Sequence, residues 1–200
     1  MKLSRKRSMA WIAISGIVFL ADAFAQQNMS LCISGYNNQR SGFYDQAILD
    51  LENCIKTGNL TNANLARVYR YVGQAHNAKE EYLQAINSYD QALSLNPSDP
   101  WYDFLNRANA YSSAGELQKS LADYEEALKL NPDLGAAYFY RGIVYEKMGQ
   151  FEKAKSDITV GYQKGFRSPQ INARMFYFQL KKKSSNVDSV IEVEKTDDKN

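Results

Sequence analysis

One spacing pattern recurs four times in this 200-residue sequence and limits what the chain can fold into. In each copy a small residue is followed twelve positions later by a second small residue, and the copies lie 34 to 38 residues apart. The four pairs are Gly35 and Ala47, Gly73 and Ala85, Ala108 and Ser120, and Gly142 and Ala154. A segment of that length cannot bury an apolar face alone, so each copy must pack against its neighbours. The pattern predicts a one-dimensional stack of repeated elements.

Two antiparallel helices are predicted within each repeat. In the second copy an apolar stripe at helical spacing runs through Ala85, Ile86, Tyr89, Ala92 and Leu93. The dipeptides Asn96-Pro97 and Asn131-Pro132 end their helices, because a residue before proline avoids helical dihedral angles. In three of the copies a glycine stands at the turn between the two helices, where a left-handed residue can cap a helix. These glycines are Gly42, Gly115 and Gly149.

The repeated residues resemble the tetratricopeptide repeat, a 34-residue helix–turn–helix unit. Aromatic residues that recur late in the middle copies, Tyr89 with Ala92 and Tyr124 with Ala127, carry the resemblance together with the small pairs. It implies an all-α fold, a right-handed α-solenoid of about four helix-turn-helix units plus a C-terminal capping helix. The expected solenoid spans residues 28–180, with repeats at 28–61, 66–99, 101–134 and 135–168 and a capping helix at 170–183. Residues 184–200 are polar and charged without periodicity, and a disordered charged tail is predicted there.

The first 25 residues have the layout of a secretory signal peptide. A basic stretch at residues 2–7 precedes an apolar run from Met9 to Ala21, and Ala23-Phe24-Ala25 offers a small-residue cleavage site. The alternative is an uncleaved anchor, but thirteen helical residues reach only about 20 Å across a hydrocarbon core of about 30 Å. We therefore expect an exported protein, periplasmic or secreted and of a bacterial envelope, with no membrane span after cleavage.

Charge and motif content argue against nucleic-acid binding and catalysis. Without residues 1–25 the chain has 20 basic and 21 acidic residues, which is no footprint for nucleic acid. Nucleophile elbows, zinc-binding helices, phosphate-cradling loops and CxxC pairs are absent from the sequence. The single histidine, His76, holds a repeat position that is tyrosine in two other copies, so a packed structural role is favoured. We expect no enzyme, no metal site and no cofactor.

Cys32 and Cys54 stand on the two predicted helices of the first repeat. In an antiparallel helix pair, side chains tilt toward their own N-termini, which moves these two sulfur atoms toward each other. Disulfides also persist outside the cytoplasm. A disulfide is therefore favoured, with two packed thiols as the alternative.

The resemblance further implies a function in protein binding. In the family the first helix of each repeat lines a concave groove that accepts peptides, and aromatic and amide side chains suit such a surface. A clamp for a partner's C-terminal carboxylate is incomplete here, because Ala136 and Tyr140 replace two of its basic residues. The expected partner is a peptide segment or helix of another protein; a self-associating structural protein and an unrecognised enzyme are the alternatives. The groove residues that the resemblance implies are Tyr36, Arg70, Tyr71, Gln74, Asn77, Tyr102, Asn106, Asn109, Phe139, Tyr140 and Glu146.

Overall fold

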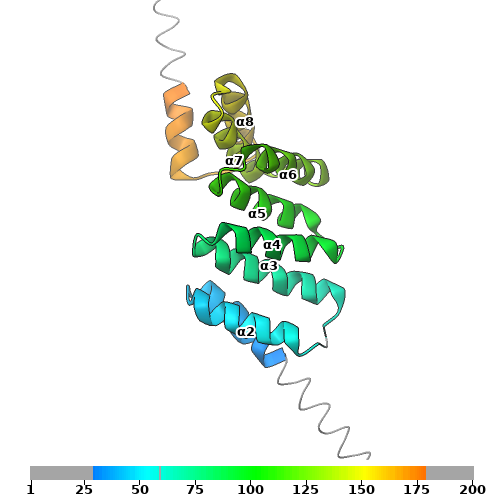
Figure 1. Cartoon of the computed structure of the whole chain (residues 1–200). Helices are drawn as coiled ribbons and strands as arrows, with labels where there is room; N and C mark the ends of the chain where they lie inside the picture. Colours follow the sequence, from blue (N-terminus) through cyan, green and yellow to red (C-terminus); the bar gives the residue numbers. More distant parts are fainter. Residues whose placement is uncertain (1–28, 59, 179–200) are drawn as a thin grey trace, which may run out of the picture. The chain divides into compact units, whose positions relative to one another are not determined.

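A computed structural model describes residues 29–58 and 60–178, and these residues form helices joined by short turns, with no strand among them (Figure 1). The predicted signal peptide, the end of the predicted capping helix and the predicted tail lie outside the described residues. One helix spans residues 29–40 and another spans residues 169–178. The others are α2 (Tyr44–Lys56), α3 (Asn62–Ala78), α4 (Tyr82–Ser94), α5 (Pro100–Ser113), α6 (Leu117–Leu130), α7 (Gly135–Lys147) and α8 (Phe151–Gln163).

Each predicted repeat contains one antiparallel pair of helices. The first repeat holds the helix over residues 29–40 with α2, and the later ones hold α3 with α4, α5 with α6, and α7 with α8. The turn residue has a positive φ in every pair: 83° at Gly42, 84° at Gly115 and 73° at Gly149. In the second repeat the same position is Glu80, which holds a φ of 63° although it carries a side chain. The all-α fold class predicted from the sequence is confirmed.

The first small residue of a repeat marks where its two helices approach closely. A Cβ atom added at Gly73 would lie 2.7 Å from Cε1 of Tyr89, and one added at Gly142 would lie 2.7 Å from Cγ1 of Ile158. In both pairs the facing residue comes sixteen positions later, and both facing residues are buried. A larger side chain would push the helices apart, which explains why the sequence keeps these positions small.

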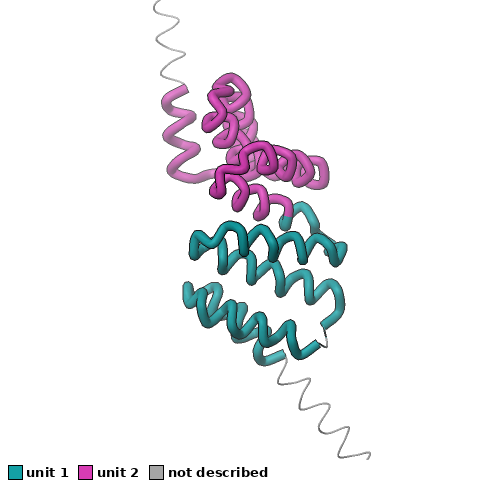
Figure 2. The backbone as a smooth tube through the Cα atoms, in the orientation of Figure 1, with its two compact units in different colours: residues 1–103 teal, residues 104–200 magenta. Residues whose placement is uncertain are grey.

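The chain divides into two compact units, residues 1–103 and 104–200, with the boundary inside α5 (Figure 2). In the described part of unit 1, Leu51 and Cys54 pack with Val68 and Val72 of α3. In unit 2, one cluster joins α5, α6 and α7 around the fully buried Tyr124. A second cluster joins α7, α8 and the terminal helix through Phe139, Ile158 and Ile171.

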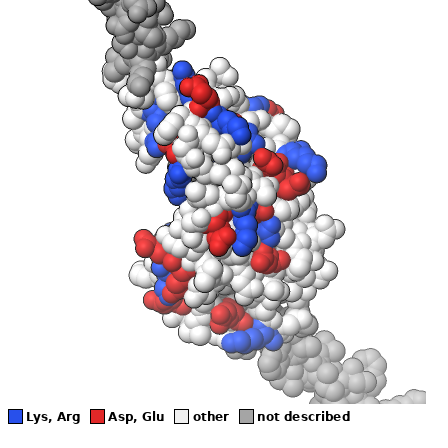
Figure 3. Space-filling model, turned by 45° about the horizontal axis from the view of Figure 1, so that its top comes forward, with Lys and Arg blue, Asp and Glu red and all other residues white. Residues whose placement is uncertain are grey.

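Arginine–aspartate ion pairs connect the two helices of the third and of the fourth repeat. Arg107 of α5 grips Asp123 of α6 through two hydrogen bonds of 2.7 and 2.8 Å, and Arg141 of α7 grips Asp157 of α8 through two of 2.7 and 2.9 Å. Both aspartates are buried and again lie sixteen residues after their partners. On the face drawn in Figure 3, acidic and basic side chains lie interspersed rather than gathered by sign.

The first repeat places Ser34 where the third and fourth repeats place arginine. Asp50 of α2 is the matching carboxylate, and it accepts hydrogen bonds from Ser34 Oγ at 2.6 Å, Asn38 Nδ2 at 2.9 Å and Gln46 Nε2 at 2.6 Å. The bond from Ser34 lowers the pKa of Asp50 more than burial raises it, and Gln46 and Asn38 lower it further. The structure also joins Cys32 to Cys54 in a disulfide, with Cα atoms 5.2 Å apart.

Candidate peptide-binding site

Five of the eleven groove residues implied by the repeat register line one pocket in unit 1. The pocket has a volume of about 420 Å³ and is bounded by the helix over residues 29–40, α3 and the start of α5. We call it the tyrosine pocket. Its lining residues are Tyr36, Gln39, Arg40, Arg70, Tyr71, Gln74, Asp99, Trp101 and Tyr102.

Two pairs of aromatic rings form the apolar part of the tyrosine pocket. The rings of Tyr36 and Tyr71 lie 4.9 Å apart between centroids, at an interplanar angle of 50°. Trp101 and Tyr102 meet edge to face, 5.3 Å apart at 87°. Aromatic side chains have few rotatable bonds, so they offer a large contact area at low entropic cost.

Arg70 belongs to this pocket, but its charge is already paired. Its Nε and Nη2 atoms donate to the two carboxylate oxygens of Asp103 at 2.6 and 2.7 Å, and Asp103 is fully buried. The hydrogen bond to Asp103 raises the pKa of Arg70, outweighing the opposite effect of burial. The guanidinium also lies 5.1 Å from the ring centroid of Tyr102. Arg70 therefore fixes the position of Tyr102 rather than presenting an unpaired cation to a ligand.

Hydrogen-bond donors stand beside these rings. Gln74 donates from Nε2 to the Tyr102 hydroxyl at 3.4 Å, and Arg40 donates from Nη1 to the Tyr36 hydroxyl at 3.3 Å. Amide and guanidinium groups in such weak contacts can exchange them for the carbonyl oxygens of an extended peptide. Asn77, one turn beyond Gln74, does not line the pocket, and its buried Oδ1 has no hydrogen-bond partner among the described residues.

The side chains of two predicted groove residues in unit 2 already contact other parts of the unit. Phe139 is 4% exposed and packs with Ile158 and Ile171, so its assignment to an open groove is wrong. The reason is the close approach of α8, which brings the backbone of Gly161 against Phe139. Asn109 accepts a hydrogen bond from the hydroxyl of Tyr124, whose pKa burial raises.

The other predicted residues of unit 2 lie at or near its surface without sharing one pocket. Asn106 is half-buried on α5. Tyr140 is 38% exposed and stands beside Phe139 and Phe166, at centroid distances of 5.2 and 5.9 Å.

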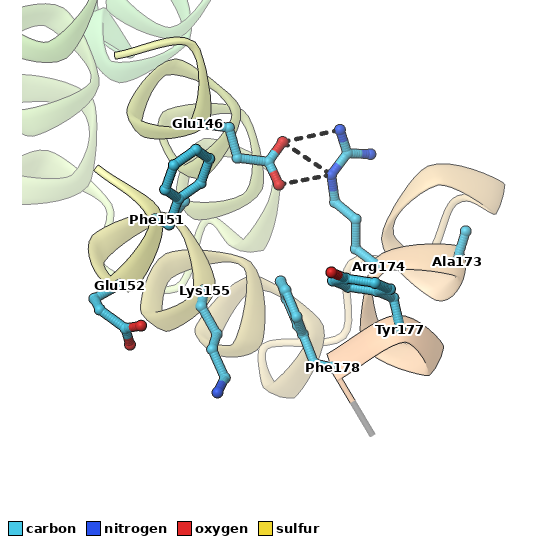
Figure 4. Close-up of a pocket in the computed structure, with 9 residues that line it drawn as sticks. Glu146, Phe151, Glu152, Lys155, Ala173, Arg174, Tyr177 and Phe178 are labelled. Atoms are coloured by element: carbon cyan, nitrogen blue, oxygen red, sulfur yellow. Dashed lines mark hydrogen bonds and ion pairs between the residues drawn. The ribbon is translucent and has the colours of Figure 1, made fainter. Parts of the chain in front are cut away.

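Glu146 lines a separate pocket of unit 2, of about 610 Å³, which we call the Arg174 pocket. Arg174 of the terminal helix donates from Nε and Nη2 to the Glu146 carboxylate at 3.0 to 3.2 Å, and Figure 4 shows this ion pair across the pocket. Phe178 and Tyr177 enter from the terminal helix, and Phe151 and Lys155 from α8. The Glu146 carboxylate and the Arg174 guanidinium are hydrogen-bonded to each other. A ligand in this pocket would therefore have to compete with that ion pair for either group.

Four residues of the tyrosine pocket were not predicted: Gln39, Arg40, Asp99 and Trp101. Gln39 could have been found, since it holds the same repeat position as Asn77 and Glu146. Arg40 and Trp101 lie at positions that the repeat register does not assign to the groove, so their place depends on the paths of the helices.

The described residues contain no group of three or more histidine, cysteine, aspartate or glutamate side chains placed to hold a metal ion. Within the same residues, none of the helices combines the length and the apolarity that crossing a membrane requires. His76 Nδ1 lies 2.6 Å from Oε2 of Glu81, across the turn between α3 and α4. That contact gives His76 a structural partner.

Comparison with known proteins identifies the repeat. Family models described as TPR repeat and tetratricopeptide repeat match residues 108–149 and residues 61–88 and 72–99. The chain is similar to the heat-shock protein cognate co-chaperone sgt12 of Aspergillus fumigatus, with 36% identity over 96 residues that cover 48% of this chain and 27% of the relative. It is also similar to the photosystem I assembly protein Ycf3 of a Synechococcus strain, with 29% identity over 132 residues that cover 63% of this chain and 76% of that protein. The chain thus spans about a quarter of the fungal co-chaperone.

Solved structures share the fold. The crystal structure of MamA aligns with a TM-score of 0.63 and 23% identity over 82% of this chain and 95% of that chain. A tetratricopeptide repeat protein from Parabacteroides merdae aligns with a TM-score of 0.65 and 24% identity, covering 82% of this chain and 62% of its own. The fold and the repeats define a helical repeat protein of the α-solenoid class. Residues 61–99 and 108–149 match models of the tetratricopeptide repeat, and the relatives that share these repeats include a co-chaperone and an assembly protein.

Proposed function

We propose that this chain is an exported, non-catalytic binding module that holds an extended segment of a partner protein in the tyrosine pocket. The observation that carries the proposal is the convergence of five register-defined groove residues, from three helices, on one pocket. Two ring pairs supply apolar contact there, and Gln39, Gln74 and Arg40 supply donors for backbone carbonyl oxygens. A role in assembling or scaffolding other proteins is the function that the co-chaperone and assembly-protein relatives favour.

Export is the second part of the proposal and rests on the first 25 residues. Their basic, apolar and small-residue segments support cleavage after Ala25. A Cys32–Cys54 disulfide agrees with this location, because an oxidising compartment preserves such bonds. The partner would then be a protein of the bacterial envelope or the exterior.

The test selects peptides from a random library on the full chain produced in a bacterium and measures their affinity by fluorescence anisotropy. We expect Trp101→Ala to weaken binding of the selected peptide by about thirtyfold, as for an aromatic residue at the centre of an interface. Phe151→Ala is the matched control, because Phe151 is 68% exposed and lines the Arg174 pocket instead.

Each alternative gives a different result. A larger loss from Phe151→Ala than from Trp101→Ala would move the site to unit 2. Failure to select any peptide, combined with a mass that grows with concentration, would replace the proposal with self-association. Circular dichroism of both variants checks that their helices remain.

A further inference from the structure

A second pocket of unit 1 shares residues with the tyrosine pocket and is lined by Cys32, one of the two disulfide cysteines. It has a volume of about 380 Å³, and its lining includes Cys32, Ile33 and Leu60. We call it the Cys32 pocket. Tyr36 and Tyr71 line both pockets, so this ring pair forms the wall between them. A change at Cys32 therefore acts on a wall of the proposed binding site.

The helix over residues 29–40 supplies Tyr36, Gln39 and Arg40 to the tyrosine pocket. Its links to α2 differ from those in the third and fourth repeats, because Ser34 stands where an arginine there bonds both oxygens of the matching aspartate. Neutral donors of Ser34 and Asn38 remain, together with the disulfide. Met29 and Ile33, which line the Cys32 pocket from the same helix, are 56% and 52% exposed. The covalent bond is thus the strongest single link between this helix and α2.

The two cysteines differ in exposure. Cys54 is fully buried, whereas Cys32 is half-buried and lines the open Cys32 pocket. A thiol can therefore approach Cys32 through that pocket, and attack at Cys32 makes Cys54 the leaving group.

We propose that the Cys32–Cys54 bond is a reversible thiol–disulfide exchange site whose reduction releases the helix over residues 29–40 and dismantles the tyrosine pocket. The co-substrate is a small thiol or dithiol. One thiolate attacks Cys32, the sulfur–sulfur bond breaks, and Cys54 leaves as a thiolate that takes up a proton. A second thiol resolves the mixed disulfide, so that two thiols are oxidised to one disulfide while the protein gains two thiol groups. The consequence for peptide binding rests on the proposed function, but the structural step does not.

Trp101 allows the step to be measured without a ligand. It lines the tyrosine pocket, and Trp11 is the only other tryptophan in the sequence. In the full chain carrying Trp11→Phe, we expect dithiothreitol to raise the quenching of Trp101 fluorescence by acrylamide. Hydrogen exchange should accelerate in residues 29–40 and stay unchanged in α7 and α8, which serve as the internal control. A variant with both Cys32→Ser and Cys54→Ser should show the reduced values with or without dithiothreitol.

Three outcomes would overturn the proposal. Quenching and exchange could remain unchanged on reduction, which would leave the bond without influence on the pocket. Protection could be lost throughout unit 1, α3 and α4 included, which would make the bond a staple of the whole unit. The double serine variant could still respond to dithiothreitol, which would place the response elsewhere.

Peptide binding separates this proposal from the proposed function. If reduction leaves a tenth of the molecules competent, the apparent affinity of a selected peptide falls about tenfold. A normal Trp101 response without peptide binding in either redox state would disprove the binding site and leave the exchange site standing. Tight peptide binding that reduction does not change would support the binding site and disprove the proposed effect of the disulfide on it.

Discussion

The first and the last helix pairs of this molecule are linked by different chemistry. In both, two residues sixteen positions apart connect one helix to the other. The last pair uses a bidentate ion pair between Arg141 and Asp157, and the first uses Ser34 with Asp50 and adds a disulfide. In these two pairs the repeat register thus places the linked residues alike but leaves the chemistry of the link open. The stability of the two pairs should therefore depend on different changes. The last pair should be sensitive to the loss of a charged side chain, and the first pair to reduction and to acid.

The largest effect is expected from breaking the ion pair of the last helix pair. Burial lowers the pKa of Arg141, but the hydrogen bonds and attraction of Asp157 outweigh it and raise the pKa overall. Arg141→Met removes the cation and leaves the carboxylate of Asp157, whose side chain is 10% exposed, without its partner. We expect a loss of about 3 kcal/mol in the free energy of unfolding, measured by urea titration with far-UV circular dichroism.

The matched control removes both charges. Arg141→Met with Asp157→Leu should recover most of the lost stability, because an apolar pair of similar volume avoids the stranded carboxylate. If the single variant were as stable as the wild type, the ion pair would contribute nothing and the contrast between the two helix pairs would fail. The two substitutions lie in contact, so their effects should be far from additive.

The fold was predictable because its determinants recur. Gly73 and Gly142 mark close approaches, and Asn96-Pro97 ends a helix, in each case at the expected repeat position. The ion pairs were within reach as well, since Arg107 and Arg141 precede their aspartates by the same sixteen residues. They were missed because the repeat comparison followed small, apolar and aromatic residues and did not include charged ones.

The site was only partly predictable because a repeat register assigns faces, whereas the neighbouring helix decides burial. Arg70 and Phe139 occupy the same repeat position. In α3 this position reaches the tyrosine pocket while paired with Asp103, but in α7 the close approach of α8 buries it. The side chain of Phe139 is covered by Ile158, Phe166 and Ile171, all far along the chain, so local pattern alone could not reveal its burial.

An intermediate effect is expected from the polar link of the first helix pair. The pKa of Asp50 lies below its ordinary value of 3.8 in the folded protein, chiefly because Ser34 donates to it. A lowered carboxylate pKa stabilises the fold above the pKa of the unfolded chain, and that stabilisation disappears as pH falls through the folded pKa. Ser34→Ala should therefore cost about 1 kcal/mol at neutral pH, and the difference from wild type should shrink below about pH 4.

Urea titrations at neutral and acid pH measure this difference. Thr159→Ala is a control for loss of a hydroxyl, because Thr159 bonds only a backbone carbonyl within α8 and faces no carboxylate in that contact. Its effect should not vary with pH. A difference between Ser34→Ala and wild type that grew in acid would contradict the assignment of Ser34 as the main cause of the lowered pKa.

The smallest effect is expected at the Arg174 pocket, where an ion pair of similar residues stands in a different setting. Glu146 and Arg174 have side chains 28% and 33% exposed, against 10% for Asp157 and 17% for Arg141. Water already solvates both partners, so Glu146→Gln strands no buried charge and should cost about 0.5 kcal/mol or less in urea titration. Arg141→Met and Glu146→Gln thus compare loss of a buried and of a half-exposed link within α7. Equal losses of stability would mean that side-chain exposure does not determine how much these two ion pairs contribute to the free energy of unfolding.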